Sequence, residues 1–334
     1  MEHTKIFEKD ARVAFIGDSI THNGLYVEYI QHYYASHLPD RRVRVYNLGI
    51  GGDAAAHSLG RIEDMLSVEP TEVVVTFCGN DLGLAHYGQS PSDEDLAKRA
   101  ERRRAHTEGM VRLVERLLSH GLPVTLCSAI GRDEYTPGTE GICSYGATDA
   151  LREMYECDLA ALLGRLKNTV DYLFPIMSLQ EALVASGCGT LFRVDRSHVN
   201  DLGQAIMARI FLRAQGLPVA VPTVSDLLLG WQEQPLPEGL HRRRNAGLRW
   251  RDLAWVYPHQ KDRTPDMTLA ERLAFWRQEL TRGDLPPYFV KMYTNYVENA
   301  EKEPEYVAEY HALSEALYAT SSEDSAAARE VLRI

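Results

Sequence analysis

Short apolar runs alternate with helical patterns over the first two thirds of the chain. The runs at 13–16 and 73–75 are almost entirely apolar, as expected of strands that are buried on both faces of a parallel sheet. Between the runs, apolar residues recur at helical spacing. This alternation predicts an α/β fold in which helices cover a parallel sheet. Five strands are predicted, at 12–16, 43–46, 72–77, 124–127 and 170–173.

The clearest helix is predicted after Ser92, which forms a capping box with Asp95, and it should end near Gly121. Another is predicted from about Asn200 to Gly216. Beyond 217 the strand signals disappear, and helical patterns follow a capping box at 268–271, the Pro286-Pro287 pair and Pro304. We therefore predict a domain at 1–217 and a mainly helical C-terminal extension at 218–334.

Charge and hydropathy narrow the classes of function. The chain of 334 residues has a formal net charge of −11, which argues against binding to nucleic acid or to an anionic membrane surface. No apolar run approaches the ~18 residues of a membrane span. A secretory signal peptide would need an apolar segment within residues 1–20, but the stretch from Glu8 to Arg12 is charged. A cytoplasmic protein is therefore expected.

Charge is also divided unevenly within the extension. The segment 298–334 carries 3 basic and 9 acidic residues, whereas 242–251 is rich in arginine. The acidic tail could lie against this arginine-rich segment in its own chain or in a second copy. A homo-oligomer formed through the C-terminal helices is therefore a possible arrangement.

Three polar motifs follow predicted strands. Ser19 comes after the first strand, a glycine-rich loop with Gly51 and Gly52 after the second, and Asn80 after the third. The carboxyl ends of parallel strands meet at one edge of the sheet, where α/β proteins place their sites. A serine at such a turn suits a nucleophile, and exposed backbone N–H groups or an amide suit an oxyanion hole. Ala54 occupies the last glycine position of a dinucleotide fingerprint, which excludes that reading of the loop.

A carboxylate and an imidazole stand close together near the end of the α/β region. Asp195 precedes His198 by three residues, and such a pair can hold the imidazole in one tautomer so that the other ring nitrogen accepts a serine proton. Each of these motifs by itself also has an ordinary explanation. The serine could be a helix cap, the asparagine a turn residue, and the Asp–His pair a surface coincidence.

Taken together, the four motifs resemble those of the SGNH hydrolase superfamily, also called the GDSL esterase/lipase family. The matching blocks are 17–20, 47–53, 79–81 and 195–198, and the resemblance covers about 1–217. Ile20 replaces the usual leucine, and Val199 stands where proline is frequent. The resemblance implies a flavodoxin-like three-layer α/β/α fold with a five-stranded parallel sheet.

The resemblance also implies roles for individual residues. Ser19 would be the nucleophile and His198 the general base, oriented by Asp195. The oxyanion hole would consist of Ser19, Gly52 and Asn80. The expected activity is that of a serine esterase that works through an acyl-enzyme intermediate.

The substrate expected from the resemblance is a small-molecule ester, with a short acyl group such as acetyl on a polar alcohol such as a carbohydrate. Asp53, Asp81 and Arg132 are candidate substrate contacts, although each could equally be an ordinary loop charge. An acyltransferase, a lysophospholipase or thioesterase, and a non-catalytic carbohydrate-binding protein remain alternatives. No cofactor is expected, and no metal, because the histidines lack a metal-ligand spacing.

Overall fold

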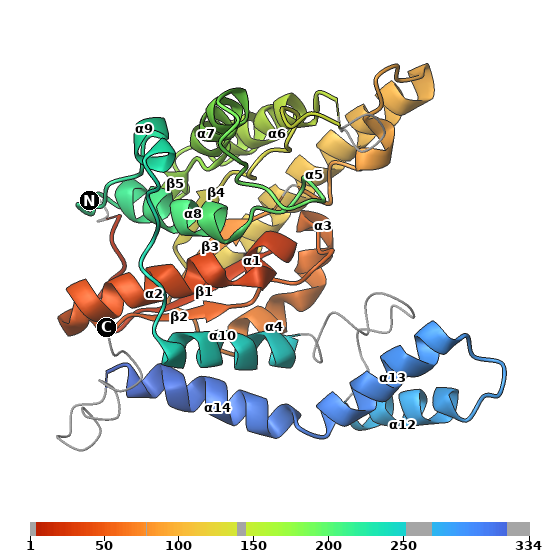
Figure 1. Cartoon of the computed structure of the whole chain (residues 1–334). Helices are drawn as coiled ribbons and strands as arrows, with labels where there is room; N and C mark the ends of the chain where they lie inside the picture. Colours follow the sequence, from red (N-terminus) through yellow and green to blue (C-terminus); the bar gives the residue numbers. More distant parts are fainter. Residues whose placement is uncertain (1–4, 78, 139–144, 252–268, 319–334) are drawn as a thin grey trace. The chain divides into compact units, whose positions relative to one another are not determined.

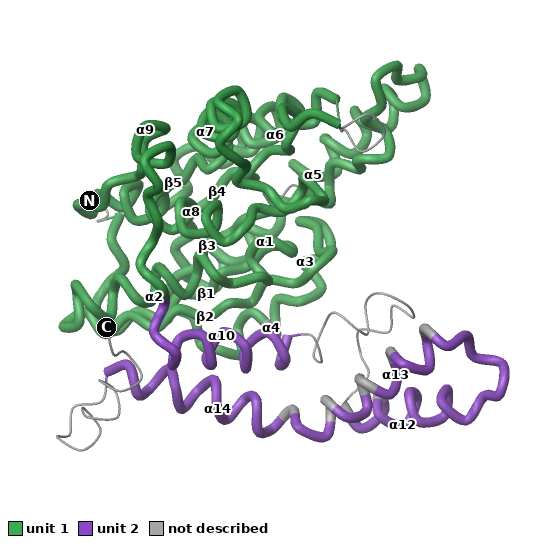
Figure 2. Tube along the Cα trace, in the orientation of Figure 1, with its two compact units in different colours: residues 1–235 green, residues 236–334 purple. Residues whose placement is uncertain are grey.

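A computed structural model of the chain describes residues 5–77, 79–138, 145–251 and 269–318. The chain forms two compact units, Met1–Pro235 and Leu236–Ile334 (Figure 2). The first holds the sheet, and the second is helical over its described residues.

The sheet of the first unit is parallel throughout, in the order β2-β1-β3-β4-β5 (Figure 1). This is the flavodoxin-like order, with its switch point between β1 and β3. The predicted five-stranded parallel sheet is thus confirmed. Its strands are β1 Arg12–Gly17, β2 Arg44–Asn47, β3 Glu72–Thr76, β4 Val124–Cys127 and β5 Asn168–Val170.

The fifth strand differs from the prediction at 170–173, because the strand already ends at Val170. The backbone N–H of Leu173 donates to Ser128 Oγ at 3.0 Å and to Asp171 Oδ1 at 2.9 Å. These side chains accept the first N–H groups of the helix α7, which begins at Leu173. The segment 170–173, Val-Asp-Tyr-Leu, therefore spans a strand end and a helix start, which periodicity alone does not separate.

Helices cover both faces of the sheet, as the alternation predicts. α2 and α8 pack together on one face, and α5 packs with α6 on the other (Figure 1). The α-helices of this unit are α1 Ser19–Asn23, α2 Leu25–His37, α3 Ala55–Ser58, α4 Ile62–Leu66, α5 Asp93–Ser119, α6 Ala147–Ala161, α7 Leu173–Ala185, α8 Asp201–Ala214 and α9 Val224–Leu228. Short 3₁₀ turns lie at η1 Pro39–Arg41, η2 Leu59–Arg61 and η3 Leu84–His86.

The predicted helix caps are present. Ser92 Oγ accepts the N–H of Asp95 at 3.1 Å, and an Asp95 oxygen accepts the N–H of Ser92 at 3.0 Å, which is the reciprocal capping box. Asn200 caps α8 by accepting the N–H of Gly203 at 3.0 Å. Local sequence therefore fixed where α5 and α8 begin.

An aromatic cluster joins β1 to α2 and α8. The ring of Phe211 lies 5.4 Å from that of Phe15 and 5.8 Å from that of Phe7, and Phe7 stacks on Tyr34 at 5.2 Å. All four side chains are buried. Such aromatic pairs add to the burial of apolar area in holding helices on a sheet.

The first unit extends past the predicted domain boundary at 217. Val219, Val221 and Trp231 pack against the core of this unit, and α9 packs against α7. The compact unit therefore continues to Pro235. The division into a catalytic domain at 1–217 and an extension at 218–334 stays a prediction.

The second unit is built from helix pairs, in which α10 packs with α14 and α12 with α13. Arg242 pairs with Glu309 at 2.8 Å, and Arg243 is buried, with its Nε donating to Ser314 Oγ at 2.8 Å. The arginine-rich segment thus contacts an acidic residue, Glu309, of the segment after 298. The bounds are α10 Glu238–Arg251, α12 Leu269–Leu280, α13 Pro287–Ala300 and α14 Glu303–Ala316.

Thr268 of the capping box and residues 319–334 of the acidic tail lie outside the described residues. Association of two copies through the C-terminal helices stays a prediction.

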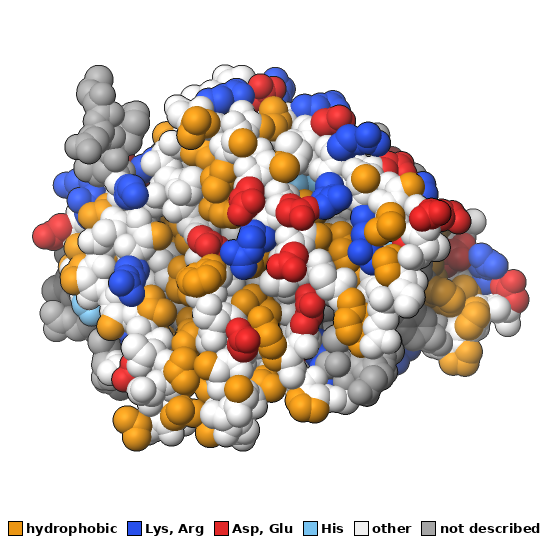
Figure 3. Space-filling model, turned by 90° about the horizontal axis from the view of Figure 1, so that it is seen from above, with side chains coloured by type: hydrophobic (Ala, Val, Ile, Leu, Met, Phe, Trp, Pro, Cys, Tyr) orange, Lys and Arg blue, Asp and Glu red, His pale blue; other side chains and the backbone are white. Residues whose placement is uncertain are grey.

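Two surface-related properties were expected from the sequence, charge without a basic face and helices that do not span a membrane. On the face seen from above, acidic and basic side chains are interspersed rather than gathered by sign (Figure 3). Within the described residues, every helix is too short or too polar to cross a bilayer.

We expect Phe211→Ala to lower the free energy of unfolding by about 3–5 kcal/mol, because it leaves a cavity inside the aromatic cluster. Phe174→Ala is the matched control, since Phe174 is 58% exposed and should change stability by less than about 0.5 kcal/mol. Urea unfolding followed by circular dichroism measures both. Equal losses in the two variants would contradict the assigned core.

Candidate active site

Ser19 lies at the tight turn between β1 and α1. Asp18 caps the short helix, with its Oδ1 accepting the N–H of Ile20 at 3.0 Å. A Cβ atom on Gly17 would lie 2.4 Å from the carbonyl oxygen of Thr76, so only glycine lets β1 approach β3 this closely. The turn places Ser19 at the carboxyl end of the sheet, as predicted.

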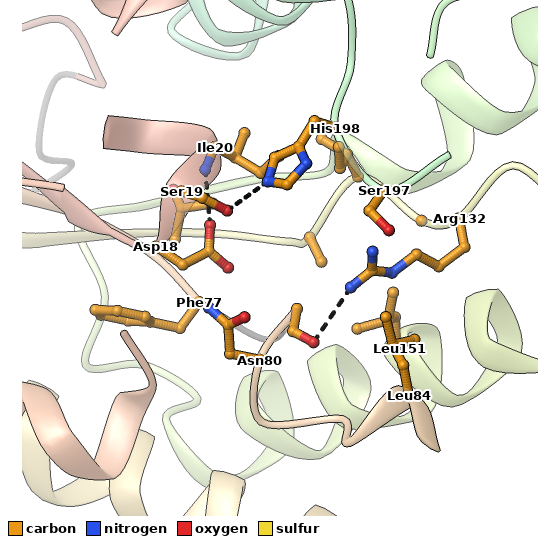
Figure 4. A pocket seen from close by; sticks show the side chains of 15 residues that line it. Asp18, Ser19, Ile20, Phe77, Asn80, Leu84, Arg132, Leu151, Ser197 and His198 are labelled. Atoms are coloured by element: carbon orange, nitrogen blue, oxygen red, sulfur yellow. Dashed lines mark hydrogen bonds between the residues drawn. The ribbon is translucent and has the colours of Figure 1, made fainter. Parts of the chain in front are cut away.

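Ser19, His198 and Asp195 form a continuous hydrogen-bonded chain. Ser19 Oγ lies 2.7 Å from His198 Nε2 (Figure 4). His198 Nδ1 lies 2.9 Å from Asp195 Oδ2. With Nδ1 donating to the carboxylate, Nε2 is the ring nitrogen that accepts the serine proton. The structure therefore brings together three side chains that the sequence separates by up to 179 positions.

The loop that carries Asp195 and His198 is tied to the neighbouring loop after β4. Arg196 has a φ of 58°, a left-handed conformation that is uncommon for a residue with a side chain. Its guanidinium donates to the carbonyl oxygens of Thr136 and Pro137 at 2.6 and 3.0 Å, and its own carbonyl accepts the N–H of Asp133 at 3.0 Å. These bonds hold the strained residue in place.

The carboxylate of Asp195 is held in its charged form. Partial burial raises the pKa of Asp195, but the N–H groups of Ser197 and His198 and the imidazole lower it more strongly, so the net pKa is lowered. Both backbone N–H groups donate to Asp195 Oδ1 at 2.9 Å. A carboxylate that accepts several N–H bonds stays ionised and can orient a histidine.

Gly52 and Asn80, two of the three predicted oxyanion-hole residues, lie on loops that are bonded to each other. Gly52 has a φ of +84°, which glycine adopts without strain. Asn80 Nδ2 donates to the carbonyl oxygen of Asp53 at 2.8 Å, which uses one of its two N–H groups and fixes the carboxamide. Asn80 and Ser19 line the cavity described next, whereas Gly52 lies outside the residues that line it.

A cavity of about 210 Å³, open to solvent, lies in front of Ser19 and His198. Its polar lining includes Asp18, Arg132 and Ser197 besides Ser19, Asn80 and His198 (Figure 4). Its apolar lining consists of Ile20, Phe77, Leu84, Ala129, Ile130 and Leu151. Convergent polar groups in a mixed cavity are typical of small-molecule sites.

Arg132 is the predicted substrate contact that lines the cavity. Its side chain follows β4 and is largely buried, and burial lowers the pKa of its guanidinium. One amino group lies 3.4 Å from the carbonyl oxygen of Gly79. The guanidinium has five N–H donors in all, so it can hold this loop and still donate into the cavity.

Asp53 and Asp81, the other two predicted substrate contacts, do not line the cavity. Asp53 is buried against Arg61, 3.1 Å from its Nε, and accepts the Ser58 hydroxyl at 2.9 Å. Asp81 is buried and accepts the N–H of Ala55 at 3.2 Å. Both carboxylates are turned into the protein, where they fix the loops, and we do not assign them to the substrate.

Asp18 lines the cavity but was missed as a functional candidate in the sequence. Burial raises the pKa of Asp18 to about 6, against the opposing effects of the Ile20 N–H and the Arg132 guanidinium. Its place beside Ser19 was the available signal, but burial of its carboxylate depends on the packing of β3 and β4.

Within the described residues, no cluster of histidine, cysteine and carboxylate side chains could hold a metal ion.

Comparison with protein families gives a match over the first unit. A model described as the GDSL-like Lipase/Acylhydrolase family matches residues 15–206, a range that contains all four blocks of the site. Comparison with curated protein sequences gave no match.

Two solved structures of enzymes have similar folds. A gut microbial diltiazem-metabolizing enzyme is 16% identical with a TM-score of 0.77, covering 95% of this chain and 96% of its own. A catalytic mutant of Axe2, an acetylxylan esterase from Geobacillus stearothermophilus, is 19% identical with a TM-score of 0.50, covering 65% and 97%. At these identities the likeness concerns the fold.

We expect Asp18→Asn to stabilise the protein more at pH 7.5 than at pH 5. The pKa of Asp18 is about 6 in the folded state, against an ordinary value of 3.8. Between pH 3.8 and pH 6 the folded wild type therefore binds more protons than the unfolded chain, and the free energy of unfolding falls as the pH rises through this range. Asparagine keeps the cap acceptor and does not titrate. The gain over wild type should grow by about 1 kcal/mol between the two pH values.

Urea unfolding at both pH values measures this change, with Asp40→Asn as the control at an exposed carboxylate. A gain for Asp18→Asn that is the same at pH 5 and pH 7.5 would contradict the raised pKa of Asp18.

Proposed function

Because the chain belongs to the GDSL-like lipase/acylhydrolase family, and is thus a hydrolase that acts on esters, we propose that it is a serine esterase with Ser19 as its nucleophile. The observation that carries this proposal is the chain of hydrogen bonds from Ser19 through His198 to Asp195, which opens onto the cavity.

In the acylation step, Ser19 Oγ attacks the ester carbonyl while His198 Nε2 takes its proton. The 2.7 Å separation of these two atoms is within the reach that general-base catalysis requires. Asp195 keeps the proton on Nδ1 and stabilises the imidazolium that forms. His198 then gives the proton to the leaving alcohol, and the acyl group remains on Ser19.

Negative charge develops on the carbonyl oxygen during this attack. The N–H of Ser19 and the second N–H of Asn80, two residues that line the cavity, would receive it, because donors fixed before the reaction need no reorganisation. The N–H of Gly52 is the third donor that the family resemblance implies. The bond from Asn80 to the carbonyl of Asp53 supports this role, since it fixes the carboxamide. Water then enters, His198 acts again as the base, and the acid is released.

The lining of the cavity supports a short acyl group on a polar alcohol. Leu151 and Ile130 offer a limited apolar surface, and Arg132 and Ser197 offer hydrogen-bonding groups on the same cavity. An acetylated carbohydrate has both kinds of surface, and an acetylxylan esterase shares the fold. We therefore propose acetyl esters of carbohydrates as the substrate class.

We expect Ser19→Ala to lower kcat by at least 10⁴-fold on p-nitrophenyl acetate and on acetylated xylose or glucose, because the nucleophile is lost. The fold should be unchanged by circular dichroism. A panel of p-nitrophenyl esters of increasing chain length and of acetylated sugars measures the substrate range. A fluorophosphonate should label the wild type at Ser19.

Other outcomes of the same panel point to other functions. Full activity of Ser19→Ala would refute the nucleophile, and failure of both hydrolysis and labelling would favour a carbohydrate-binding protein. A preference for long acyl chains or thioesters would favour a lysophospholipase or thioesterase. Esters formed with added sugar acceptors would favour an acyltransferase.

We expect Arg132→Met to raise KM for acetylated sugars by about tenfold, because one hydrogen bond from a charged group is lost. The KM for p-nitrophenyl acetate, which has no sugar hydroxyls, should stay within about twofold. Arg112→Met on the exposed side of α5 is the control. An equal rise in KM for both substrates would show that Arg132 positions the loop at Gly79 and does not bind the sugar.

A further inference from the structure

His106 lies buried in the middle of α5, between two carboxylates. Its Nε2 is 2.9 Å from Asp158 Oδ2 on α6, and its Nδ1 is 3.3 Å from Asp81 Oδ1 on the loop after β3. All three residues are buried, the imidazole to 1% exposure. The mechanism described above uses none of them. A buried histidine between two buried carboxylates therefore needs an explanation.

Asp81 connects His106 to both loops of the proposed oxyanion hole. It directly follows Asn80 in the chain, and its carboxylate accepts the N–H of Ala55 at 3.2 Å. Ala55 lies three positions after Gly52. Together with the bond from Asn80 to the Asp53 carbonyl at 2.8 Å, this bond joins the two loops at two points.

The helix α5 also contacts the Gly52 loop directly. A Cβ atom on Gly109 would lie 2.8 Å from the backbone nitrogen of Ala56, so the helix backbone packs closely against the start of α3. Gly109 is one turn after His106 and therefore on the same side of the helix. At this contact α5 packs directly on the segment that follows the Gly52 loop, so a shift of α5 would move that segment.

Each ring nitrogen of His106 faces a carboxylate oxygen at ion-pair distance, Nε2 that of Asp158 and Nδ1 that of Asp81. A neutral imidazole has one N–H, and only the imidazolium has two. Each buried carboxylate is costly without a compensating partner. Two arginines on neighbouring segments contact other groups: Arg102 on α5 lies 3.5 Å from the backbone carbonyl of Asp81, not from its carboxylate, and Arg61 on η2 pairs with Asp53.

We propose that His106 is a positioning residue for the oxyanion hole. As an imidazolium between Asp158 and Asp81, His106 fixes the Asp81 carboxylate, which joins the Gly52 loop to the Asn80 loop. This inference rests on the proposed esterase function of the same site. His106 does not touch the substrate. It acts through Asp81 on the placement of the donors that meet the developing charge.

This placement predicts an effect on kcat rather than on KM. The donors contribute in the transition state, and losing one outright typically costs roughly 10²–10³ in kcat. Displacing them by loss of His106 should cost less than removing Asn80. We expect His106→Gln to lower kcat on p-nitrophenyl acetate about tenfold or more, with KM within about twofold, and Asn80→Ala to give the larger loss.

Two controls separate this effect from a general loss of stability. His120→Gln changes an exposed histidine next to the end of the same helix and should leave kcat unchanged. Leu113→Ala removes a buried side chain from α5 and should lower the unfolding midpoint while leaving kcat of the folded enzyme within about twofold. A kcat loss in Leu113→Ala that matches the loss in His106→Gln would overturn the proposal.

A double-mutant cycle tests whether His106 acts through Asp81. In the Asp81→Asn background, His106→Gln should lower kcat less than threefold further, because the connection is already broken. Losses that multiply independently would overturn the route through Asp81. Comparison of Asp158→Asn with wild type tests the far side of the contact, with a kcat loss of the same kind expected.

The charge state of His106 can be observed directly. In enzyme with ¹⁵N-labelled histidine at pH 8, His106 should show two protonated ring nitrogens, assigned by their loss in His106→Gln. A single protonated nitrogen would overturn the imidazolium. If wild type hydrolyses no ester, the proposed function fails; if wild type is active and His106→Gln behaves as His120→Gln, only this inference fails.

Discussion

The close approach of β1 to β3 at the switch point of the sheet is the constraint on which the site depends. Gly17 ends β1 where a Cβ atom would collide with the Thr76 carbonyl. β1 and β3 are parallel and paired at this point. The loop that carries Ser19 after β1 and the loop that carries Asn80 after β3 therefore start next to each other. The nucleophile and an oxyanion donor are thus brought together by backbone pairing, and the remaining groups of the site are added around them.

Buried polar networks hold the loops around this point. Asp53 is fixed by Arg61 and Ser58, and Asp81 by its contacts with Ala55 and His106. Charges taken out of water require partners with good geometry, so such networks permit few loop conformations. That rigidity suits an oxyanion hole, whose donors contribute only if they are in place before charge develops.

The triad side of the site is organised differently. Asp195 and His198 are partly exposed, at 48% and 37% of their side-chain surface. Their loop is held by its own backbone bonds to Asp195 and by the anchoring of Arg196 to Thr136 and Pro137. The site therefore combines a rigid buried side with a tethered surface loop, and the cavity with Arg132 lies between them.

Sequence patterns determined the elements and the identity of the reacting groups. Continuous apolar runs predicted the buried parallel strands, the caps at Ser92 and Asn200 predicted where two helices begin, and the four blocks predicted Ser19, Asn80, Asp195 and His198. These signals are local, because a cap, a glycine turn or a buried strand acts on residues a few positions away. The end of the fifth strand was predicted three residues too late because Ser128, far along the chain, binds the N–H of Leu173, where α7 begins.

Only the tertiary structure decided which polar side chains face the cavity. Asp53, Asp81 and Arg132 were equivalent as strand-end charges, yet Arg132 alone of the three lines the cavity. The direction of a side chain depends on partners such as Arg61 and His106, which lie 8 and 25 positions away from the carboxylates they contact. Such pairings arise from the packing of α5, α6 and the loops, which no local pattern encodes.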